Sequence, residues 1–239
     1  MRSSPIVIHL GGSAVVPHIS DQGGINTAFL KDFLLFVRMQ LRRKKRLIIV
    51  VGGGKTCRVY QQAARKVKKV LGRDLDWIGI YAGCLNAHLL RALFAKEAYP
   101  AVIDHEPSQT EVNIMKRSKR ALFFASGWGP GWSHDYVAVG LAKKFGAKEV
   151  FIAKDTPFVY DADPKKHAHA KPFKRLSWKA YKKIIPHAWS PGLSTPMDPV
   201  ATRLAEKLSL TAKIFKAADL KSFGNAVAGK PFEGTTITP

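Results

Sequence analysis

The stretch LIIVVGGGKTCRVYQQAARKVKK, residues 47–69, joins a short apolar run to three glycines and then to a helical pattern. The run LIIVV at 47–51 is continuous and apolar, which is typical of a strand buried on both faces of a parallel sheet. A strand, a glycine loop and a helix start together gather backbone N–H groups and the positive end of a helix dipole, which suits an anion. The stretch therefore indicates one strand–loop–helix unit of an α/β fold.

The same alternation continues along the chain. Further apolar runs occur at IVIHL (6–10), AVI (101–103), ALFFA (121–125), EVFIA (149–153) and AKIF (212–215). Helical patterns are expected at 27–42, 57–69, 77–96, 135–145, 177–184, 198–208 and 219–228. This order predicts a three-layer α/β/α sandwich with a largely parallel central sheet. With no internal repeat and no clear linker, we expect a single domain over residues 1–239.

Composition limits the classes of protein that this chain can belong to. At 239 residues and 46% hydrophobic content, it can bury a core and is not generally disordered. No apolar run reaches the roughly 20 residues of a membrane helix, and the N-terminus lacks a signal-peptide pattern. Cys57 and Cys84 match no metal or redox spacing. We therefore expect a cytoplasmic protein with reduced thiols and no membrane partner.

The chain is strongly basic, with 39 Lys and Arg against 17 Asp and Glu, a formal charge of +22. Such a balance raises the hypothesis of nucleic-acid binding. The lysines and arginines occur in short sequence clusters, here called basic knots, among them RRKKR at 42–46 and KRSKR at 116–120. We interpret these clusters as dispersed over a solvated surface. No nucleic-acid-binding signature accompanies them, so no specific nucleic-acid partner is expected.

Two more strands run into glycine-rich turns: IHLGGS, with Gly11, Gly12 and Ser13, and ASGWGPGWSHD at 125–135. A single loop of this kind is more often only a tight turn, but three at strand ends favour phosphate binding, because ligands of such sheets bind beyond the carboxyl ends of the strands. Lys55 and Arg58 add charge to the second loop. None of the loops is a Walker A or a GxGxxG motif.

Taken in order, the motifs GGS, VVGGGKxxRxY, DWIGIxxxxLNAxLLxAL, GxGPGxSxD, VYDADPKK, MDPxAxRLAEK and GTTI resemble those of the amino-acid-kinase superfamily. The nearest resemblance is to the uridylate (UMP) kinases of archaeal type, and it runs from Ile6 to the C-terminus. It implies a transfer of the γ-phosphoryl group of ATP to UMP with Mg2+, and a homo-oligomer, usually a hexamer. It also implies that the part of the chain to about residue 145 holds the acceptor and the part from about 146 holds ATP.

The resemblance carries over to individual positions of this sequence. It implies ATP-binding roles for Gly12, Ser13, Gly54, Arg58, Lys154, Tyr160 and Asp163. It implies UMP-binding roles for Gly53, Asp76 and the loop Trp128, Gly129, Pro130, Gly131, Trp132, Ser133 and His134. No metal ligand is assigned to the protein.

The implied chemistry needs no strong general base, because the attacking oxygen of UMP is already anionic. Catalysis then consists of alignment, charge neutralisation and exclusion of water. We predict Lys55 and Arg58 as the catalytic cations, with Lys154 as a further candidate.

The sequence departs from the family pattern at several positions. His9 stands where many relatives carry a lysine, and a histidine is largely neutral at pH 7. Ser133 and His134 stand where two threonines are usual. The family's TNVDGVY appears here as KDTPFVY at 154–160, so that Lys154 replaces the Thr and the turn has lost its glycine. We expect a changed backbone path and altered ATP geometry there.

Two alternatives to a UMP kinase remain open from the sequence. One is a protein that binds ATP and an oxoanion, similar to the molybdenum-storage proteins, although their His-rich loop is not evident here. The other is a kinase for a different phosphate or carboxylate acceptor.

Trp128 and Trp132 are interpreted either as shaping the UMP loop or as subunit packing. Asp198-Pro199 is interpreted as a helix start.

Overall fold

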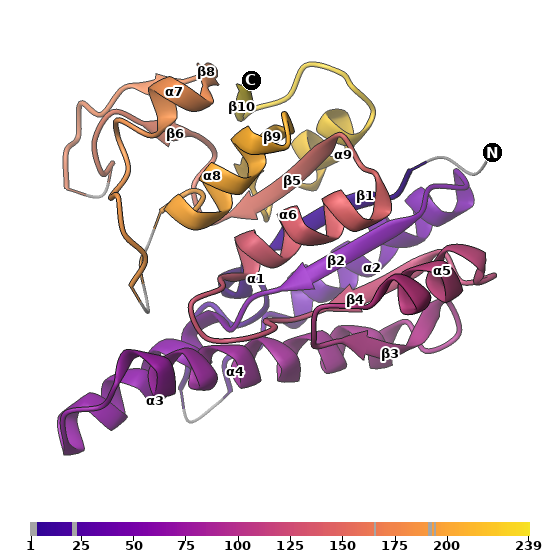
Figure 1. Ribbon diagram of the computed structural model, residues 1–239, viewed down its shortest axis with the longest axis horizontal. Helices are drawn as coiled ribbons and strands as arrows, with labels where there is room; N and C mark the ends of the chain where they lie inside the picture. Colours follow the sequence, from indigo (N-terminus) through magenta and orange to yellow (C-terminus); the bar gives the residue numbers. More distant parts are fainter. Residues whose placement is uncertain (1–3, 21–22, 165, 191–192, 194) are drawn as a thin grey trace.

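A computed structural model describes residues 4–20, 23–164, 166–190, 193 and 195–239. In it a central sheet lies between two layers of helices (Figure 1). The strand order within the described residues is β3-β4-β2-β1-β5-β9-β10-β8, and neighbouring strands are parallel except for β9 and β10. The strands are β1 (Ile6–Leu10), β2 (Leu47–Val51), β3 (Ala98–Ile103), β4 (Leu122–Ala125), β5 (Glu149–Lys154), β8 (Arg175–Ser177), β9 (Thr211–Lys216) and β10 (Thr235–Thr238). A separate antiparallel pair is formed by β6 (Val159–Tyr160) and β7 (Pro172–Phe173).

The helices cover the sheet on both faces. They are α1 (Gly12–Val15), α2 (Thr27–Arg42), α3 (Gly54–Val67), α4 (Gly72–Leu93), α5 (Gln109–Arg117), α6 (His134–Phe145), α7 (Trp178–Tyr181), α8 (Pro199–Lys207) and α9 (Leu220–Val227). One buried cluster packs α2, α4 and α9 on the sheet, and the other packs α5, α6, α7 and α8 on the opposite face. Within the described part of the chain, no helix has the length and apolar character needed to cross a bilayer.

The apolar runs predicted from the sequence are strands with two buried faces. On β2, Ile48 and Val50 belong to one cluster, while Leu47, Ile49 and Val51 belong to the other. All five are fully buried, because successive side chains of a strand point to opposite faces and helices cover both. The prediction of a three-layer, largely parallel α/β/α sandwich is therefore confirmed.

The helix predictions are confirmed in place but differ in extent. The structure begins α4 at Gly72 rather than at Trp77, and it reduces the helix expected at 177–184 to the four residues of α7. Helix α5 was not predicted, although its capping box, in which Ser108 and Glu111 satisfy each other's backbone N–H groups, is a readable start signal. Strands β6, β7, β8 and β10 were also missed, because two to four residues carry too little periodicity.

Parallel pairing brings the carboxyl ends of β1, β2, β4 and β5 to one edge of the sheet. The glycine loops at 11–13, 52–54 and 126–133 therefore lie at this edge, together with the β5–β6 turn. The C-terminal strand holds that turn in place, since Thr235 Oγ1 accepts a hydrogen bond from the backbone N–H of Val159 at 2.9 Å and donates one to the carbonyl of Phe173.

The basic knots are less dispersed than the sequence suggested. Arg46 donates hydrogen bonds to the carbonyl oxygens of Met115 (2.9 Å) and Ser118 (3.3 Å), and Lys116 Nζ donates to that of Lys144 at 3.1 Å. The knots at 42–46, 116–120 and 143–144 thus meet at the amino ends of the strands, opposite the glycine loops. Helices α2, α5 and α6 end there with basic last turns, where the helix dipole favours cations.

Helix α2 provides a direct test of the layered core. Phe33 is fully buried between α2 and the sheet, whereas Leu35, two residues on, is 66% exposed. We expect Phe33→Ala to lower the free energy of unfolding by about 3–5 kcal/mol, because it removes buried apolar surface and leaves a cavity. Leu35→Ala should change it by less than about 0.5 kcal/mol. Urea unfolding of both variants would measure this, and equal losses would contradict the assigned packing of α2.

Candidate active site

A cavity of about 520 Å³ lies beyond the carboxyl ends of β1, β2, β4 and β5. This volume is within the range of small-molecule sites. Its walls come from all three glycine loops, the first turns of α3 and α4, the β5–β6 turn, the following segment to Pro164, the segment 184–186, and Thr195, Pro196 and Asp198. The cavity therefore lies where ligands of open α/β sheets bind.

The first two glycine loops contact each other backbone to backbone. A Cβ atom placed on Gly12 would lie 2.1 Å from the backbone N of Gly54 and 2.2 Å from the carbonyl O of Gly52. Gly54 itself has a φ of +63°, a conformation that favours glycine. The Asn86 side chain fixes the second loop through a 2.8 Å hydrogen bond to the carbonyl of Gly52. The packing of the two loops therefore requires glycine at these positions. The backbone of the same glycines also lines the cavity.

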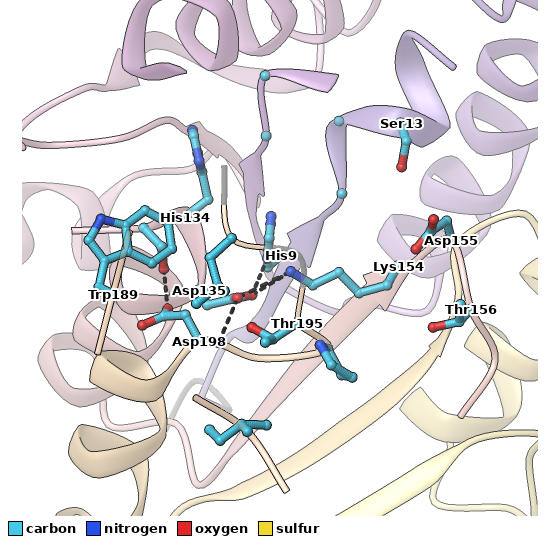
Figure 2. Close-up of a pocket in the computed structure, with 18 of the residues that line it drawn as sticks. His9, Ser13, His134, Asp135, Lys154, Asp155, Thr156, Trp189, Thr195 and Asp198 are labelled. Atoms are coloured by element: carbon cyan, nitrogen blue, oxygen red, sulfur yellow. Dashed lines mark hydrogen bonds and ion pairs between the residues drawn. The ribbon is translucent and has the colours of Figure 1, made fainter. Parts of the chain in front are cut away.

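Asp135, in the first turn of α6, is the centre of a buried polar network (Figure 2). Its carboxylate accepts hydrogen bonds from His9 Nδ1 on β1 at 2.5 Å and from the backbone N–H of Asp198 at 3.2 Å. Lys154 Nζ, at the end of β5, lies 3.0 and 3.1 Å from its two oxygens. One carboxylate thereby joins two strands and the start of α8 to α6.

The charges of this network follow from its contacts. Burial alone would raise the pKa of Asp135, but the charge of Lys154 and the hydrogen bonds from His9 and Lys154 outweigh it and hold that pKa well below its usual range. Burial and the nearby Lys154 charge lower the pKa of His9. At neutral pH the unit is therefore an ammonium, a carboxylate and a neutral imidazole, and His9 donates its Nδ1 proton to Asp135.

His134 packs beside this network as a second neutral histidine. Its ring stacks on His9 with centroids 6.0 Å apart, and a Cβ atom on Gly83 would lie only 2.3 Å from its Nε2. Burial first, and then the neighbouring His9, lower the pKa of His134 to about 3. The residue lines the cavity, while its Nε2 atom is buried against Gly83 without a hydrogen-bond partner in the described protein.

Asp198 and Ser133 link the starts of α6 and α8. Ser133 Oγ donates a hydrogen bond to Asp198 Oδ2 and accepts one from the backbone N–H of Tyr136 at 3.1 Å. Asp198 Oδ1 accepts from the backbone N–H groups of Val200 and Ala201, so the expected helix start at Asp198-Pro199 is confirmed. Both side chains also border the cavity, which the sequence did not indicate for Asp198.

The residues expected on the acceptor side divide into two groups. Gly53, Asp76, Trp132, Ser133 and His134 line the cavity. Asp76 also accepts a 2.8 Å hydrogen bond from the backbone N–H of Gly131, which ties the third loop to α4. Trp128 is instead buried in the core against Gly140 of α6, and it does not border the cavity, nor do Gly129, Pro130 and Gly131.

The residues expected on the ATP side all border the cavity: Gly12, Ser13, Gly54, Arg58, Lys154, Tyr160 and Asp163. Asp155, Thr156 and Phe158 of the KDTPF segment border it too. The turn that lost its glycine is made without a left-handed residue, since Lys44 and Ser209 are the non-glycine residues with positive φ in the described chain. Lys55, a predicted catalytic cation, does not line this cavity.

The mostly parallel sheet between two helical layers, with glycine loops meeting at one cavity, defines a protein of the three-layer α/β class whose cavity has the backbone that suits an anion. A model of the amino acid kinase family matches residues 4–216. The uridylate kinase of Hyperthermus butylicus is 30% identical over 240 residues, covering 100% of both chains. That of Pyrococcus abyssi is 30% identical, over 98% of this chain and 99% of the relative.

The crystal structure of uridylate kinase from Archaeoglobus fulgidus is similar in fold, with a TM-score of 0.74 and 26% identity, over 98% of this chain and 100% of that one. The chain belongs to the amino acid kinase family. The resemblance seen in the sequence motifs is therefore confirmed over nearly the whole chain.

The contact between the glycine loops predicts a sharp steric effect. Gly12→Ala should lower the melting temperature by several degrees and abolish nucleotide binding, because its Cβ cannot fit against Gly52 and Gly54. Gly224→Ala on α9 is the matched control, since its Cβ would meet Phe36 at an ordinary 3.6 Å. Calorimetry and ATP titration of both variants would measure this, and a Gly12→Ala protein with normal melting and binding would contradict the assigned loop packing.

The two neutral histidines predict acid sensitivity. His134 stays neutral in the folded protein down to about pH 3, but in the unfolded chain it is protonated below its ordinary pKa of 6.5. The unfolded state then binds more protons, so stability is full above pH 6.5 and falls as the pH decreases, by up to about 1.4 kcal/mol per pH unit for one such group. Urea unfolding at about pH 7, 6 and 5 should show this, and His134→Gln should flatten the slope. An unchanged slope in that variant would contradict a buried neutral His134.

Proposed function

We propose that this protein is a UMP kinase, which transfers the γ-phosphoryl group of ATP to UMP and forms UDP and ADP. The observation that carries the proposal is the full-length 30% identity with uridylate kinases. It is supported by a cavity large enough for small-molecule substrates and bordered by the three glycine loops. No observation favours an oxoanion-storage role or another acceptor over UMP.

The two substrates would enter the cavity from different sides. On the ATP side we assign Gly12, Ser13, Gly54, Arg58, Tyr160 and Asp163, which border the cavity together with the β5–β6 turn. On the acceptor side we assign Gly53, Asp76, Trp132, Ser133 and His134. The division does not follow the two halves of the chain, since Gly12, Ser13, Gly54 and Arg58 on the ATP side come from the part before residue 145 and only Tyr160 and Asp163 come from the part after it.

The site is suited to phosphates and to the Mg2+ that accompanies ATP. Five glycines of the first two loops, Gly11, Gly12, Gly52, Gly53 and Gly54, line the cavity, and glycine backbone of this kind can approach phosphates closely. No group of three His, Cys, Asp or Glu side chains with metal-binding geometry occurs among the described residues. Mg2+ takes most of its ligands from phosphates and water in such enzymes, and it would neutralise charge on the phosphate oxygens when bound.

We also propose a cytoplasmic homo-oligomer, of the hexamer type that the sequence resemblance implies. Apolar side chains on the outer surfaces of α3 and α4 support an assembly through these helices. Tyr60, Trp77, Tyr81 and Leu85 are exposed there, and Trp77 stacks on Tyr81 with ring centroids 5.8 Å apart. Such a patch is typical of a surface that another chain covers.

The first test is turnover by the wild-type protein. With ATP and Mg2+ at saturation we expect ADP release that depends on UMP, and UDP as the product by chromatography. CMP, dCMP and simple carboxylic acids should be poorer acceptors. If UMP at saturation elicits no ADP, the proposal is wrong.

The acceptor side has its own test at Asp76. Asp76→Asn keeps an oxygen for the N–H of Gly131 but removes the charge offered to a ribose hydroxyl. We expect KM for UMP to rise about 10- to 100-fold, with KM for ATP nearly unchanged. Asp74→Asn, two residues earlier on the same helix and exposed, should leave both values unchanged. A rise in KM for ATP alone would reverse the assignment of the two sides.

A further inference from the structure

The side chain of Lys154 crosses the cavity between its two sides. In Figure 2 it extends from the side of Ser13 and Asp155 toward His134 and Asp135, and its ammonium lies at Asp135. The side chain is 17% exposed and lines the cavity. Among the described residues that line the cavity, Lys154 is the only lysine and Arg58 is the only arginine. Arg58 lies in the first turns of α3.

The path of the Lys154 side chain is fixed by the neighbouring loop. Lys154 ends β5, which pairs with β1 in the register Leu10 to Ala153, and the backbone N–H of Gly11 donates to the carbonyl of Ala153 at 2.8 Å. A Cβ atom at Gly11 would lie 2.9 Å from that oxygen and 3.8 Å from Lys154 Cδ. The lysine stem therefore runs directly beside the first glycine loop, where the phosphates of ATP are assigned.

The two main departures from the family pattern, His9 and Lys154, meet at the same carboxylate. His9 reaches Asp135 Oδ1 from β1, and Lys154 reaches it from β5. His9 is neutral and buried, so it adds no positive charge. A third donor, the backbone N–H of Asp198, also forms a hydrogen bond to the Asp135 carboxylate. The network therefore brings one ammonium group to the cavity, that of Lys154, and the Asp135 carboxylate beside it balances its charge.

We propose that Lys154 is the catalytic cation of the phosphoryl transfer, that Asp135 positions its ammonium, and that His9 positions Asp135. This inference rests on the proposed kinase function. In the transfer, the bond from the terminal phosphorus to the bridging oxygen of ATP breaks, and ADP leaves with the electron pair. A bond forms from that phosphorus to an anionic oxygen of UMP, so no proton moves. Lys154 keeps its protons and neutralises charge on the phosphoryl oxygens during transfer.

The proposal replaces the prediction that Lys55 supplies this charge. Lys55 lies in the first turn of α3, and its backbone N–H donates to the carbonyl of Val16 at 2.9 Å. It does not line the cavity, whereas Lys154 does. Coulomb energy falls with distance and is screened by solvent, which favours the enclosed ammonium.

The test compares lysine variants by kcat and KM. Lys154→Met removes the charge and keeps the length, and we expect kcat to fall about 10²- to 10³-fold with KM for UMP nearly unchanged. Lys154→Arg should retain part of the rate. Lys182→Met removes a surface pair with Glu206 and should leave kcat unaltered. If Lys55→Met lowers kcat more than Lys154→Met does, the proposal is overturned.

A rescue experiment separates a catalytic charge from a structural one. Lys154→Thr, with the residue of the family pattern, should lose activity. Adding His9→Lys supplies an ammonium from β1 to the same carboxylate, and we expect at least about a tenfold recovery of kcat. Melting curves and calorimetric ADP binding control for folding. A failure of wild-type turnover would concern the proposed function, whereas a folded, ADP-binding Lys154→Met with wild-type kcat would overturn only the role of Lys154.

Discussion

The carboxylate of Asp135 is the interaction on which the cavity depends. Its three donors come from His9 on β1, Lys154 on β5 and the backbone of Asp198 before α8, so one side chain joins elements that are distant in sequence. If one of these donors were removed, the buried carboxylate would still have its desolvation cost but would lose the hydrogen bond or ion pair that offsets it. The network therefore constrains both the positions of the strand ends and the charge that they present.

Close packing of glycine loops is the second constraint, and it acts together with the first. Gly12 contacts Gly52 and Gly54 so closely that no side chain fits, and a side chain at Gly11 would collide with the carbonyl oxygen of Ala153. The same backbone that must be free of side chains to pack is thus the backbone available to phosphates. Structural and functional demands on these glycines coincide, and this is why several glycines follow strands in one chain.

Much of the site was predictable, and the exceptions have physical reasons. The first two glycine loops follow from motifs at strand ends, Asp76, Tyr160 and Asp163 follow from the family resemblance, and all of these line the cavity. Asp135 was missed although it closes the motif GxGPGxSxD, because its partner His9 lies 126 positions away. Trp128 was assigned to the acceptor loop, but its ring turns inward and packs on α6. The direction of a side chain at a loop depends on tertiary packing and not on the motif that contains it.

The residue pattern alone was sufficient for the fold class, the family and the edge of the sheet where ligands bind. The fold class and the ligand edge follow from local rules, namely the period of buried side chains, the conformational freedom of glycine and the order of strands and helices, and the family follows from the resemblance of the motifs. Only the tertiary structure decided which lysine reaches the cavity, that two substitutions meet at one carboxylate, and that three basic knots share one edge. Such facts depend on register and helix placement, which bring together residues that no local pattern relates.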